Sequence, residues 1–253
     1  MGQLDGQVAL ITGSSRGIGH FMAQELAKEG CNIVIAARTE EVTDPKLPGT
    51  IHTVAAEMEE IGVEALPIKL DVTSDEDIGS AMPAILDRFG RLDILINNAA
   101  LIFPASFQQT AVKRLDLLHR INVRGPFLMT QAVLPHMLEQ GSGTVITISS
   151  GAADSPSANN LIYGMSKVSI EKMMEGLAAE LGQQGIRSFG LKPEGLVLSP
   201  GATYHGLPNA NTDTEPNDLM GRAAIWLITS DEAAEHNGES FYSRRIVQEQ
   251  FGD

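Results

Sequence analysis

The chain has 253 residues, of which 43% are hydrophobic, and this is enough for one domain with a sizeable core. Its 18 basic and 32 acidic side chains leave a formal net charge of −14, which argues against nucleic acid as a partner. The single cysteine excludes a disulfide within the chain, and we find neither a secretory signal nor an apolar run of roughly 20 residues. We therefore expect one domain over residues 1–253, a cytoplasmic location and no membrane contact.

Short apolar runs alternate with longer amphipathic segments along the chain. The predicted strands are 8–11, 32–35, 65–70, 92–96, 144–148 and 187–191, and the predicted helices are about 18–29, 51–61, 75–88, 111–139 and 160–182. Strands that are apolar almost throughout indicate a sheet covered on both faces, and hence parallel strands. The alternation predicts a doubly wound α/β fold with its ligand outside the carboxyl ends of the strands. Two segments, 39–50 and 198–217, have the composition of loops.

The first predicted strand runs into a glycine-rich turn, Thr12-Gly13-Ser14-Ser15-Arg16-Gly17-Ile18-Gly19, where a helix begins. Glycines at such a turn let the backbone approach a pyrophosphate, which the helix N-terminus then stabilises. The spacing is G-x-x-x-G-x-G rather than the commoner G-x-G-x-x-G, and no Gly-Lys-Ser/Thr follows, so the turn is not a P-loop. The alternative is a glycine-rich turn without a ligand, but its position favours nucleotide binding.

The second predicted strand ends in Ala36-Ala37-Arg38. An acidic residue here would bind the ribose 2′-hydroxyl of NAD, whereas arginine accommodates the 2′-phosphate of NADP. Arg38 and Arg16 therefore favour NADP(H), with NAD(H) as the alternative if both arginines are only solvated surface groups. The following loop also carries three carboxylates that would oppose a 2′-phosphate if the loop folded over the ribose, Glu40, Glu41 and Asp44.

A tyrosine and a lysine four residues apart, Tyr163 and Lys167, share one face of a predicted helix. A positive charge near a phenol lowers the pKa of the phenol from about 10, so proton transfer to a ketone or alkoxide oxygen becomes possible near neutral pH. Such pairs are also common on surface helices. The pair acquires meaning from the serines that precede it, Ser149 and Ser150, and from the rest of the chain.

Taken together, these segments resemble the short-chain dehydrogenase/reductases, a family of single-domain Rossmann-fold oxidoreductases that use NAD or NADP. The matching pieces, in the order of the family, are 12–19, Asp71-Val72, 97–100, Asn122, Ser150, Tyr163 with Lys167, and Pro193. Segments 44–51 and 113–116 are similar to a subgroup that includes hydroxysteroid-dehydrogenase-like protein 2 and bacterial terpene-alcohol dehydrogenases. The resemblance implies a parallel sheet of about seven strands with helices on both faces, and an oxidation–reduction of the CH–OH/C=O type.

The resemblance also implies roles for the four catalytic candidates. Ser150 would hydrogen-bond the substrate oxygen, whereas Ser149 would point to the opposite side of an extended chain. Tyr163 would exchange the proton. Lys167 would hold the nicotinamide ribose and lower the pKa of Tyr163. Asn122 would hold a water of a proton relay, the alternative being an asparagine that only caps or kinks a helix.

The implied cofactor site consists of the glycine-rich turn and of residues at the ends of strands. Asp71 would contact the adenine amino group and Val72 would pack on its ring, while Asn98 and Ala99 would line the cofactor. The full set is Gly13, Ser15, Arg16, Gly17, Ile18, Gly19, Arg38, Asp71, Val72, Asn98, Ala99, Tyr163, Lys167 and Pro193. We expect no metal, because the histidines lack ligand spacing and one cysteine cannot build a zinc site.

Three regions depart from the family pattern: position 100, positions 194–198 and the segment 238–246. Ala100 stands where the family commonly has glycine, and Glu194, which follows Pro193, also stands where the family usually has glycine. Leu198 occupies the position of a threonine that would face the nicotinamide, with Ser199 next to it. The segment 238–246 lacks the usual Val-Asp-Gly-Gly ending but alternates enough to predict a final strand. Glu194 could point away as a structural residue or change cofactor binding.

By the same resemblance, the substrate pocket is formed by 101–104, 151–162 and 196–207, the last within a substrate loop of about 195–217 that carries Tyr204 and His205. The apolar run 101–103 favours a hydrophobic ketone, aldehyde or secondary alcohol, although such a run could equally be core. The absence of arginine and lysine from 151–162 and 196–207 argues against a strongly anionic substrate.

Two other functions stay open, a non-catalytic NADP-binding or interaction protein and a 3-oxoacyl-thioester reductase. The acidic net charge opposes the second, because its carrier protein would also be acidic. The helices 111–139 and 160–182 would pair with a second subunit in a homodimer or homotetramer. The methionines Met165, Met173 and Met174 suit such an interface or the core.

Overall fold

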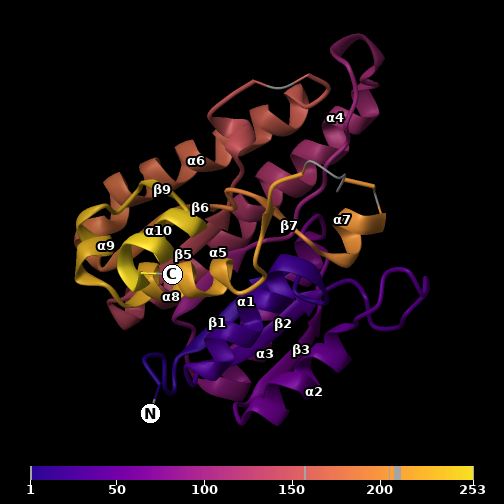
Figure 1. Ribbon diagram of the computed structural model, residues 1–253. Coiled ribbons are helices and arrows are strands. Elements are labelled where there is room, and N and C mark those ends of the chain that lie inside the picture. The colour runs from indigo at the N-terminus through magenta and orange to yellow at the C-terminus, as the bar shows by residue number, and fades with distance from the viewer. Residues whose placement is uncertain (1, 157, 205, 208–211, 253) are drawn as a thin grey trace.

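Seven parallel strands form the central sheet in the order β3-β2-β1-β4-β5-β6-β9 (Figure 1). In the computed structural model, which describes residues 2–156, 158–204, 206–207 and 212–252, the strands are β1 Val8–Thr12, β2 Asn32–Ala37, β3 Ala65–Lys69, β4 Ile94–Asn97, β5 Gly143–Ile148, β6 Ile186–Lys192 and β9 Ser240–Tyr242. Strand order reverses direction between β1 and β4, so the crevice between these two strands is the point where a ligand fits in such sheets. The predicted doubly wound α/β fold is confirmed.

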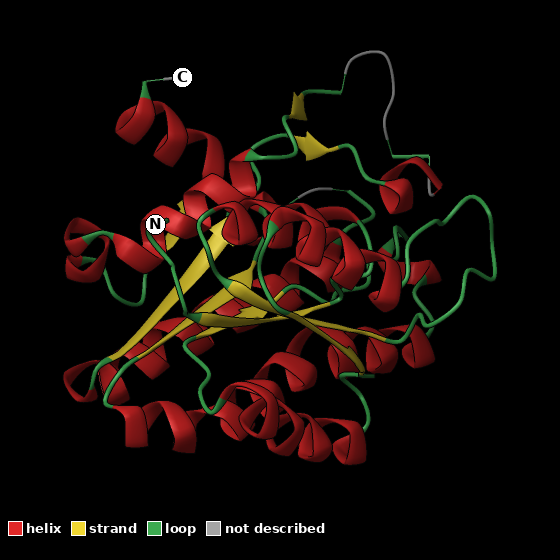
Figure 2. Ribbon diagram, turned by 90° about the horizontal axis from the view of Figure 1, so that it is seen from below, coloured by secondary structure: helices red, strands yellow, loops and turns green. Residues whose placement is uncertain are grey.

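Helices cover both faces of the sheet, which Figure 2 shows nearly edge-on. The longer helices are α1 Gly17–Lys28, α2 Ile51–Ile61, α3 Asp75–Phe89, α4 Val112–His119, α5 Gly125–Gln140, α6 Leu161–Leu181, α8 Leu219–Thr229 and α10 Ser243–Phe251, and the short ones are α7 Pro200–Tyr204 and α9 Asp231–Glu235. One core joins the sheet to α1, α2, α8 and α10. The other core joins it to α3, α5 and α6.

Strand β1 shows why two cores form around one sheet. Ala9 and Ile11 point into the first core, whereas Val8 and Leu10 point into the second. Successive side chains of a strand alternate between its two faces, so a strand that is apolar throughout needs helices on both sides. Every residue of β1 is accordingly buried.

The predicted helix 111–139 is wrong as a single element. The structure has α4, then a π-helical turn over Arg120–Arg124, and then α5, which begins with Gly125 and Pro126. A π-turn widens the helix and lets one residue bulge inward, and such turns occur often at functional sites. Here the turn contains Asn122, which is buried.

The predicted final strand over 238–246 is too long. Strand β9 consists of three residues only, Ser240–Tyr242, and α10 begins directly at Ser243. Ile246 and Val247 turn into the core that contains α8, and this burial favours a helix over an extended chain. The side chains of 243–245 therefore follow the carboxyl end of β9.

The two predicted loops differ from each other. Residues 39–50 form a loop whose end contacts the glycine-rich turn: a Cβ on Gly49 would lie 2.3 Å from the carbonyl oxygen of Ser15. The segment 198–217 instead contains regular structure. It includes α7 and the strand β8 Thr214–Glu215, which pairs in parallel with β7 Leu196–Val197. Among the described helices, none has both the length and the apolar character needed to cross a membrane.

Candidate active site

A cavity of about 850 Å³ lies along the carboxyl ends of the strands. Each of the six longer strands contributes wall residues immediately after its end, as expected for a ligand site of a parallel sheet. The predicted site residues that line it are Gly13, Ser15, Arg16, Gly17, Ile18, Arg38, Asp71, Val72, Asn98, Ala99, Ser150, Tyr163 and Pro193. The structure thus brings together, in one cavity, nearly all residues that the sequence singled out.

The backbone of the glycine-rich turn needs its glycines. Gly13 has φ +68°, and a Cβ there would lie 2.9 Å from Cα of Ala99, so a side chain would be both strained and crowded. Gly19 lies outside the cavity wall. A Cβ on Gly19 would lie 2.5 Å from the Asn98 amide nitrogen, so this glycine allows α1 to pack closely beside the end of β4. Asn98 in turn donates a 2.8 Å hydrogen bond to the carbonyl of Thr12.

The N-terminus of α1 is built to receive an anion. Its N-cap residue, Arg16, makes no side-chain capping hydrogen bond, and its first turn carries no acidic residue. The first N–H groups of such a helix carry partial positive charge and favour a phosphate. The Nε of Arg16 is buried without a hydrogen-bond partner among the described residues, while its Nη2 donates to the carbonyl of Gly49 at 3.0 Å. The residues present therefore fit a nucleotide pyrophosphate.

Arg38 extends into solvent at the far end of the cavity, with 72% of its side chain exposed and its Nη1 3.9 Å from Oδ2 of Asp71. Two acidic residues of the adjacent loop bind other groups. Glu40 pairs with Lys69 at 2.6 Å, and Asp44 accepts the backbone N–H of Lys46. The two arginines on the cavity wall are thus not neutralised by these two carboxylates.

Asp71 presents a charged acceptor at the end of β3. Its Oδ1 accepts hydrogen bonds from the N–H and the hydroxyl of Thr73, both at 2.8 Å. Burial alone would raise the pKa of Asp71, but these bonds and the attraction of Arg38 outweigh burial, so the pKa lies below its ordinary value. The carboxylate therefore stays ionised at neutral pH and can accept hydrogen bonds from an amino group.

Ser150 and Tyr163 both line the cavity. Burial raises the pKa of Tyr163 to about 12, and the neighbouring Ser150 hydroxyl opposes this rise. Burial also lowers the pKa of Lys167 to about 8, against the opposing charge of Glu171. The lowering of the Tyr163 pKa by Lys167 stays a prediction, because burial dominates the pKa shifts of both groups in this structure.

Lys167 lies behind the tyrosine rather than in the cavity wall. Its side chain is 2% exposed, its Nζ donates to the carbonyl of Ile148 at 2.6 Å, and the same atom lies 5.3 Å from the centre of the Tyr163 ring. Lys167 and Tyr163 thus occupy one face of α6, as their spacing predicts.

Asn122 connects three parts of the site from the π-helical turn. Its Oδ1 accepts the N–H of Leu101, and its Nδ2 donates to the carbonyl of Leu101, both at 2.8 Å. Nδ2 also donates to the hydroxyl of Ser166 on α6. Asn122 therefore fixes the segment after β4 against α6 from its position in the π-helical turn. The role of Asn122 in a proton relay stays a prediction.

The structure distinguishes the two serines. Ser149 is buried and its hydroxyl donates to Glu171 at 2.5 Å, away from the cavity that Ser150 lines. Glu171 also pairs with Lys192 at 3.1 Å. Ser150 is thus the catalytic candidate, in agreement with the sequence prediction.

Sequence reasoning missed two wall residues, Tyr242 and Arg245. Tyr242 is the last residue of β9 and Arg245 comes three residues later, so the parallel topology itself brings them to the site. The sequence could have predicted their position only if the end of the last strand had been known, and the alternation in 238–246 does not show where that strand ends. Ile121 also lines the cavity and was not singled out.

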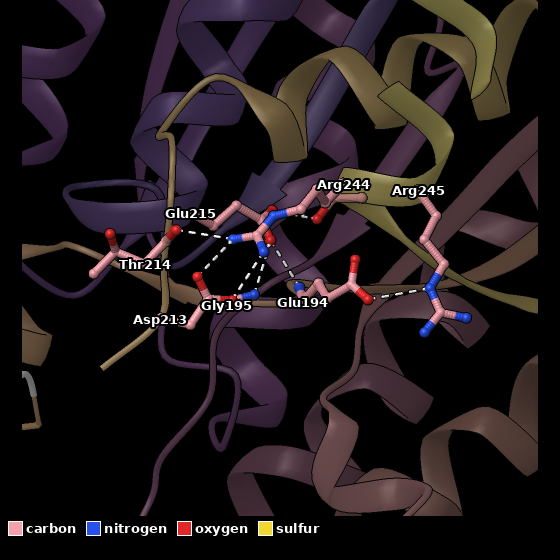
Figure 3. A network of polar contacts seen from close by, with 8 residues as sticks. Glu194, Gly195, Asp213, Thr214, Glu215, Arg244 and Arg245 are labelled. Carbon is pink, nitrogen blue, oxygen red and sulfur yellow. Dashed lines mark hydrogen bonds and ion pairs between the residues drawn. The ribbon is translucent and has the colours of Figure 1, made fainter. Parts of the chain in front are cut away.

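The unusual Glu194 is a structural residue that also lines the cavity (Figure 3). Its carboxylate accepts a 3.1 Å hydrogen bond from Nε of Arg245. Its backbone N–H and that of Gly195 both donate to Glu215, at 2.7 and 3.1 Å. Glu215 is buried and also accepts the hydroxyl of Ser243. Side chains of α10 and β8 thereby hold the backbone after β6.

The other departures have simple structural outcomes. Leu198 is 46% exposed and is not part of the wall, whereas Ser199 lines the cavity opposite Gly17. Ala100 is accommodated at the wall. Of the predicted pocket segments, the wall includes Leu101, Ile102, Gly151, Asn160, Leu196, Val197, Ser199, Gly201, Ala202 and Leu207. Tyr204 is 48% exposed and His205 lies outside the described residues.

Within the described residues, no three histidine, cysteine or acidic side chains cluster closely enough to hold a metal ion. The parallel sheet, the glycine-rich turn and the Ser–Tyr–Lys arrangement together are the features on which the family resemblance of the sequence rests. The chain belongs to the short-chain dehydrogenase family, whose model matches residues 7–203.

Relatives and solved structures support this assignment. Hydroxysteroid dehydrogenase-like protein 2 of Danio rerio is 39% identical over 229 residues, which is 90% of this chain and 55% of that protein. The chain thus spans little more than half the length of the curated relatives it matches. A Burkholderia cenocepacia gluconate 5-dehydrogenase in complex with NADP and tartrate is 28% identical, with a TM-score of 0.83 over 94% of both chains. A 7α-hydroxysteroid dehydrogenase complexed with NADH and 7-oxo glycochenodeoxycholic acid is 25% identical, with a TM-score of 0.83 over 94% of both chains.

Proposed function

We propose that this protein is an NADP(H)-dependent oxidoreductase that interconverts a hydrophobic ketone or aldehyde and the corresponding alcohol. The observation that carries the proposal is that Ser150 and Tyr163 line the same cavity as the glycine-rich turn and the uncapped N-terminus of α1. A protein that only bound nucleotide would need neither the hydroxyl pair nor the lysine behind it.

Bound nicotinamide would supply or accept the hydride at the substrate carbon. In reduction, the hydroxyls of Ser150 and Tyr163 hydrogen-bond the carbonyl oxygen and polarise the C=O bond. As the carbon takes up the hydride, Tyr163 gives its proton to that oxygen; oxidation reverses both transfers. The raised pKa of Tyr163 keeps the phenol protonated at neutral pH, which suits an acid. The ammonium of Lys167 stabilises the phenolate left behind.

The preference for NADP(H) rests on Arg16 and Arg38. Both line the cavity, and two of the loop carboxylates that would compete with a 2′-phosphate bind elsewhere. Arg38→Gln should raise KM for NADPH by about tenfold or more, because it removes a charge-assisted hydrogen bond, and should change KM for NADH much less. Arg88→Gln, an exposed arginine on α3 paired with Glu64, removes the same charge and is the control. Equal losses for both nucleotides would contradict the preference.

The apolar part of the wall supports a substrate with a hydrophobic body. Leu101 and Ile102 follow β4, while Leu196, Val197 and Leu207 come from the segment after β6. These side chains line the same cavity as Ser150 and Tyr163. A medium-sized aliphatic or cyclic carbonyl compound matches such a wall.

Oxidation of NADPH and NADH by purified protein, followed side by side with a panel of hydrophobic ketones and aldehydes, tests the proposal. Turnover with NADPH supports it. Turnover with NADH alone keeps the reaction and contradicts the cofactor preference. Nucleotide binding without turnover would contradict the enzyme proposal and favour the non-catalytic alternative, and turnover restricted to 3-oxoacyl thioesters would favour the thioester reductase.

A homodimer or homotetramer, as proposed from the family resemblance, has a suitable surface on α5 and α6. Phe127, Met165 and Val168 are exposed by 52%, 46% and 50%, whereas Met174 belongs to the core. Sedimentation of the wild type and of Val168→Asp would test this assembly.

The lone thiol of Cys31 is buried and free, in keeping with the cytoplasmic location that we also propose.

A further inference from the structure

The beginning of α10 contributes a polar wall beside the catalytic serine. Tyr242 and Arg245 line the cavity together with Ser150 and Gly151. A Cβ placed on Gly151 would lie 3.2 Å from the hydroxyl of Tyr242, so this tyrosine directly adjoins the residue that follows Ser150. The C-terminal segment therefore contacts the region where a substrate would lie.

The guanidinium of Arg245 is held in place on one side only. It lies over the ring of Tyr242 with its Cζ 4.7 Å from the ring centre, and its Nε donates to Glu194. Figure 3 shows the Nε edge facing Glu194, with the two terminal nitrogens beyond it. Within the described part of the chain these terminal nitrogens make no hydrogen bond, and 61% of the side chain is exposed.

Neighbouring cations are satisfied more fully. Lys192 is buried and pairs with Asp154 at 2.6 Å and with Glu171 at 3.1 Å. Arg244 makes two bonds to Asp213 and a third to the carbonyl of Thr214. The terminal N–H donors of Arg245 thus stay available at the wall. The Tyr242 ring on which the guanidinium stacks is itself fixed by a 2.5 Å hydrogen bond from its hydroxyl to Asp154.

We propose that Arg245 binds a carboxylate of the substrate, so that the substrate is an oxo or hydroxy carboxylic acid with an apolar body. A planar guanidinium with free terminal N–H groups matches the two oxygens of a carboxylate, and stacking on an aromatic ring orients the guanidinium in advance. This inference rests on the proposed function. It revises the expectation of a non-anionic substrate, which considered segments 151–162 and 196–207 but not the C-terminal residues.

Glu194 tunes this subsite as an internal competitor. Its carboxylate occupies one donor of Arg245 and reduces the positive charge that a substrate carboxylate would meet. Removing the charge of Glu194 should therefore strengthen the preference for an acidic substrate, whereas removing the charge of Arg245 should abolish it.

The test uses short, medium and long methyl-ketone carboxylic acids, each beside its own methyl ester, with NADPH and the full chain. The measured quantity is the ratio of kcat/KM for the acid to kcat/KM for the ester. We expect wild type to prefer the acid, Arg245→Gln to lower the ratio about tenfold or more, Arg245→Lys to retain part of it, and Glu194→Gln to raise it. Arg88→Gln, far from the cavity on α3, is the matched control for the loss of one positive charge.

Each result discriminates. An unchanged ratio in Arg245→Gln overturns the subsite. If kcat/KM then falls equally for acid and ester, Arg245 only positions Glu194. A raised KM for NADPH at an unchanged ratio would assign Arg245 to the nucleotide and also overturn it. If wild type turns over neither acid nor ester with either nucleotide, the proposed function itself fails; if it turns over the ester as well as the acid, only the subsite fails.

Discussion

The two ends of the active-site cavity are constructed differently. At the nucleotide end, the wall consists of strand ends and the glycine-rich turn, and side-chain bonds to backbone groups, such as that from Asn98 to the Thr12 carbonyl, hold the turn. At the substrate end, bonds between two side chains hold the wall: Arg245 bonds Glu194, and Ser243 bonds Glu215. The first end depends on backbone geometry and glycine, and the second depends on charge pairs. Substitutions should therefore affect the two ends in different ways.

The largest effect is expected where the two ends meet. Tyr163→Phe removes the hydroxyl proton that the substrate oxygen receives as the hydride is transferred, so kcat should fall by about 10² to 10⁴-fold or more. Nucleotide affinity should change little, because the wall around the glycine-rich turn is untouched. Steady-state rates and nucleotide titration measure the two quantities. Turnover close to that of wild type would refute the assignment of Tyr163 as the acid.

At the nucleotide end, Gly13→Ala should weaken nucleotide binding by roughly 5- to 150-fold, because the added Cβ must displace the glycine-rich turn from Ala99 at a cost of about 1–3 kcal/mol. Gly13 has φ +68°, with Cα of Ala99 2.9 Å from a Cβ. Gly90→Ala is the matched control, since Gly90 has φ +70° but nothing within 4 Å. It should lose stability without losing nucleotide affinity. Equal affinity losses in both variants would mean that general destabilisation is the cause.

The ionisation of Lys167 gives a pH test. Its pKa is lowered to about 8, so the ammonium that stabilises the Tyr163 phenolate is lost above that pH, and kcat/KM for reduction should fall about tenfold per pH unit there. Tyr163, with a pKa of about 12, stays protonated throughout this range. A profile that stays flat to pH 10 would contradict the role of Lys167.

The same group should affect stability in the opposite sense. Between about 8 and its ordinary pKa of 10.5, Lys167 binds more protons in the unfolded than in the folded chain. Its contribution to the free energy of unfolding therefore rises with pH in this interval, while the rate falls. Urea unfolding of wild type and Lys167→Met across this range isolates the contribution.

The smallest effect is expected at the substrate end. Ser243→Ala removes one hydrogen bond from the buried carboxylate of Glu215, which still accepts two backbone N–H groups, and should cost about 1 kcal/mol of stability. Ser80→Ala, whose hydroxyl bonds an exposed backbone carbonyl on α3, is the control. Urea midpoints compare the two. If Ser243→Ala costs no more than the control, the wall after β6 does not depend on α10.

Much of the nucleotide end was predictable from sequence. Periodicity alone predicts strands and helices close to those observed, because in a doubly wound fold both faces of each strand are apolar. Gly13, Asp71 and Asn98 were identifiable since the turn and the strand ends are local features. The same holds for Tyr163 and Lys167, whose four-residue spacing already puts them on one helix face.

Other features depended on contacts that the linear pattern does not contain. The π-helical turn at Asn122 follows from its bonds to Leu101 and Ser166, and the early end of β9 follows from the burial of Ile246. The direction of the pKa shift of Tyr163 depends on how deeply the ring is enclosed, which spacing cannot express.

The sequence by itself determined the fold class and indicated the glycine-rich turn and the catalytic candidates, because these rest on local backbone geometry and on the periodicity of apolar residues. Only the tertiary structure decided which distant charges share the cavity. Arg245 joins the wall because parallel strands end at one edge of the sheet. The carboxylate of Glu194 pairs with Arg245 because α10 begins beside the carboxyl end of β6. Electrostatic neighbours are set by distance in space, and the order of residues along the chain does not contain that distance.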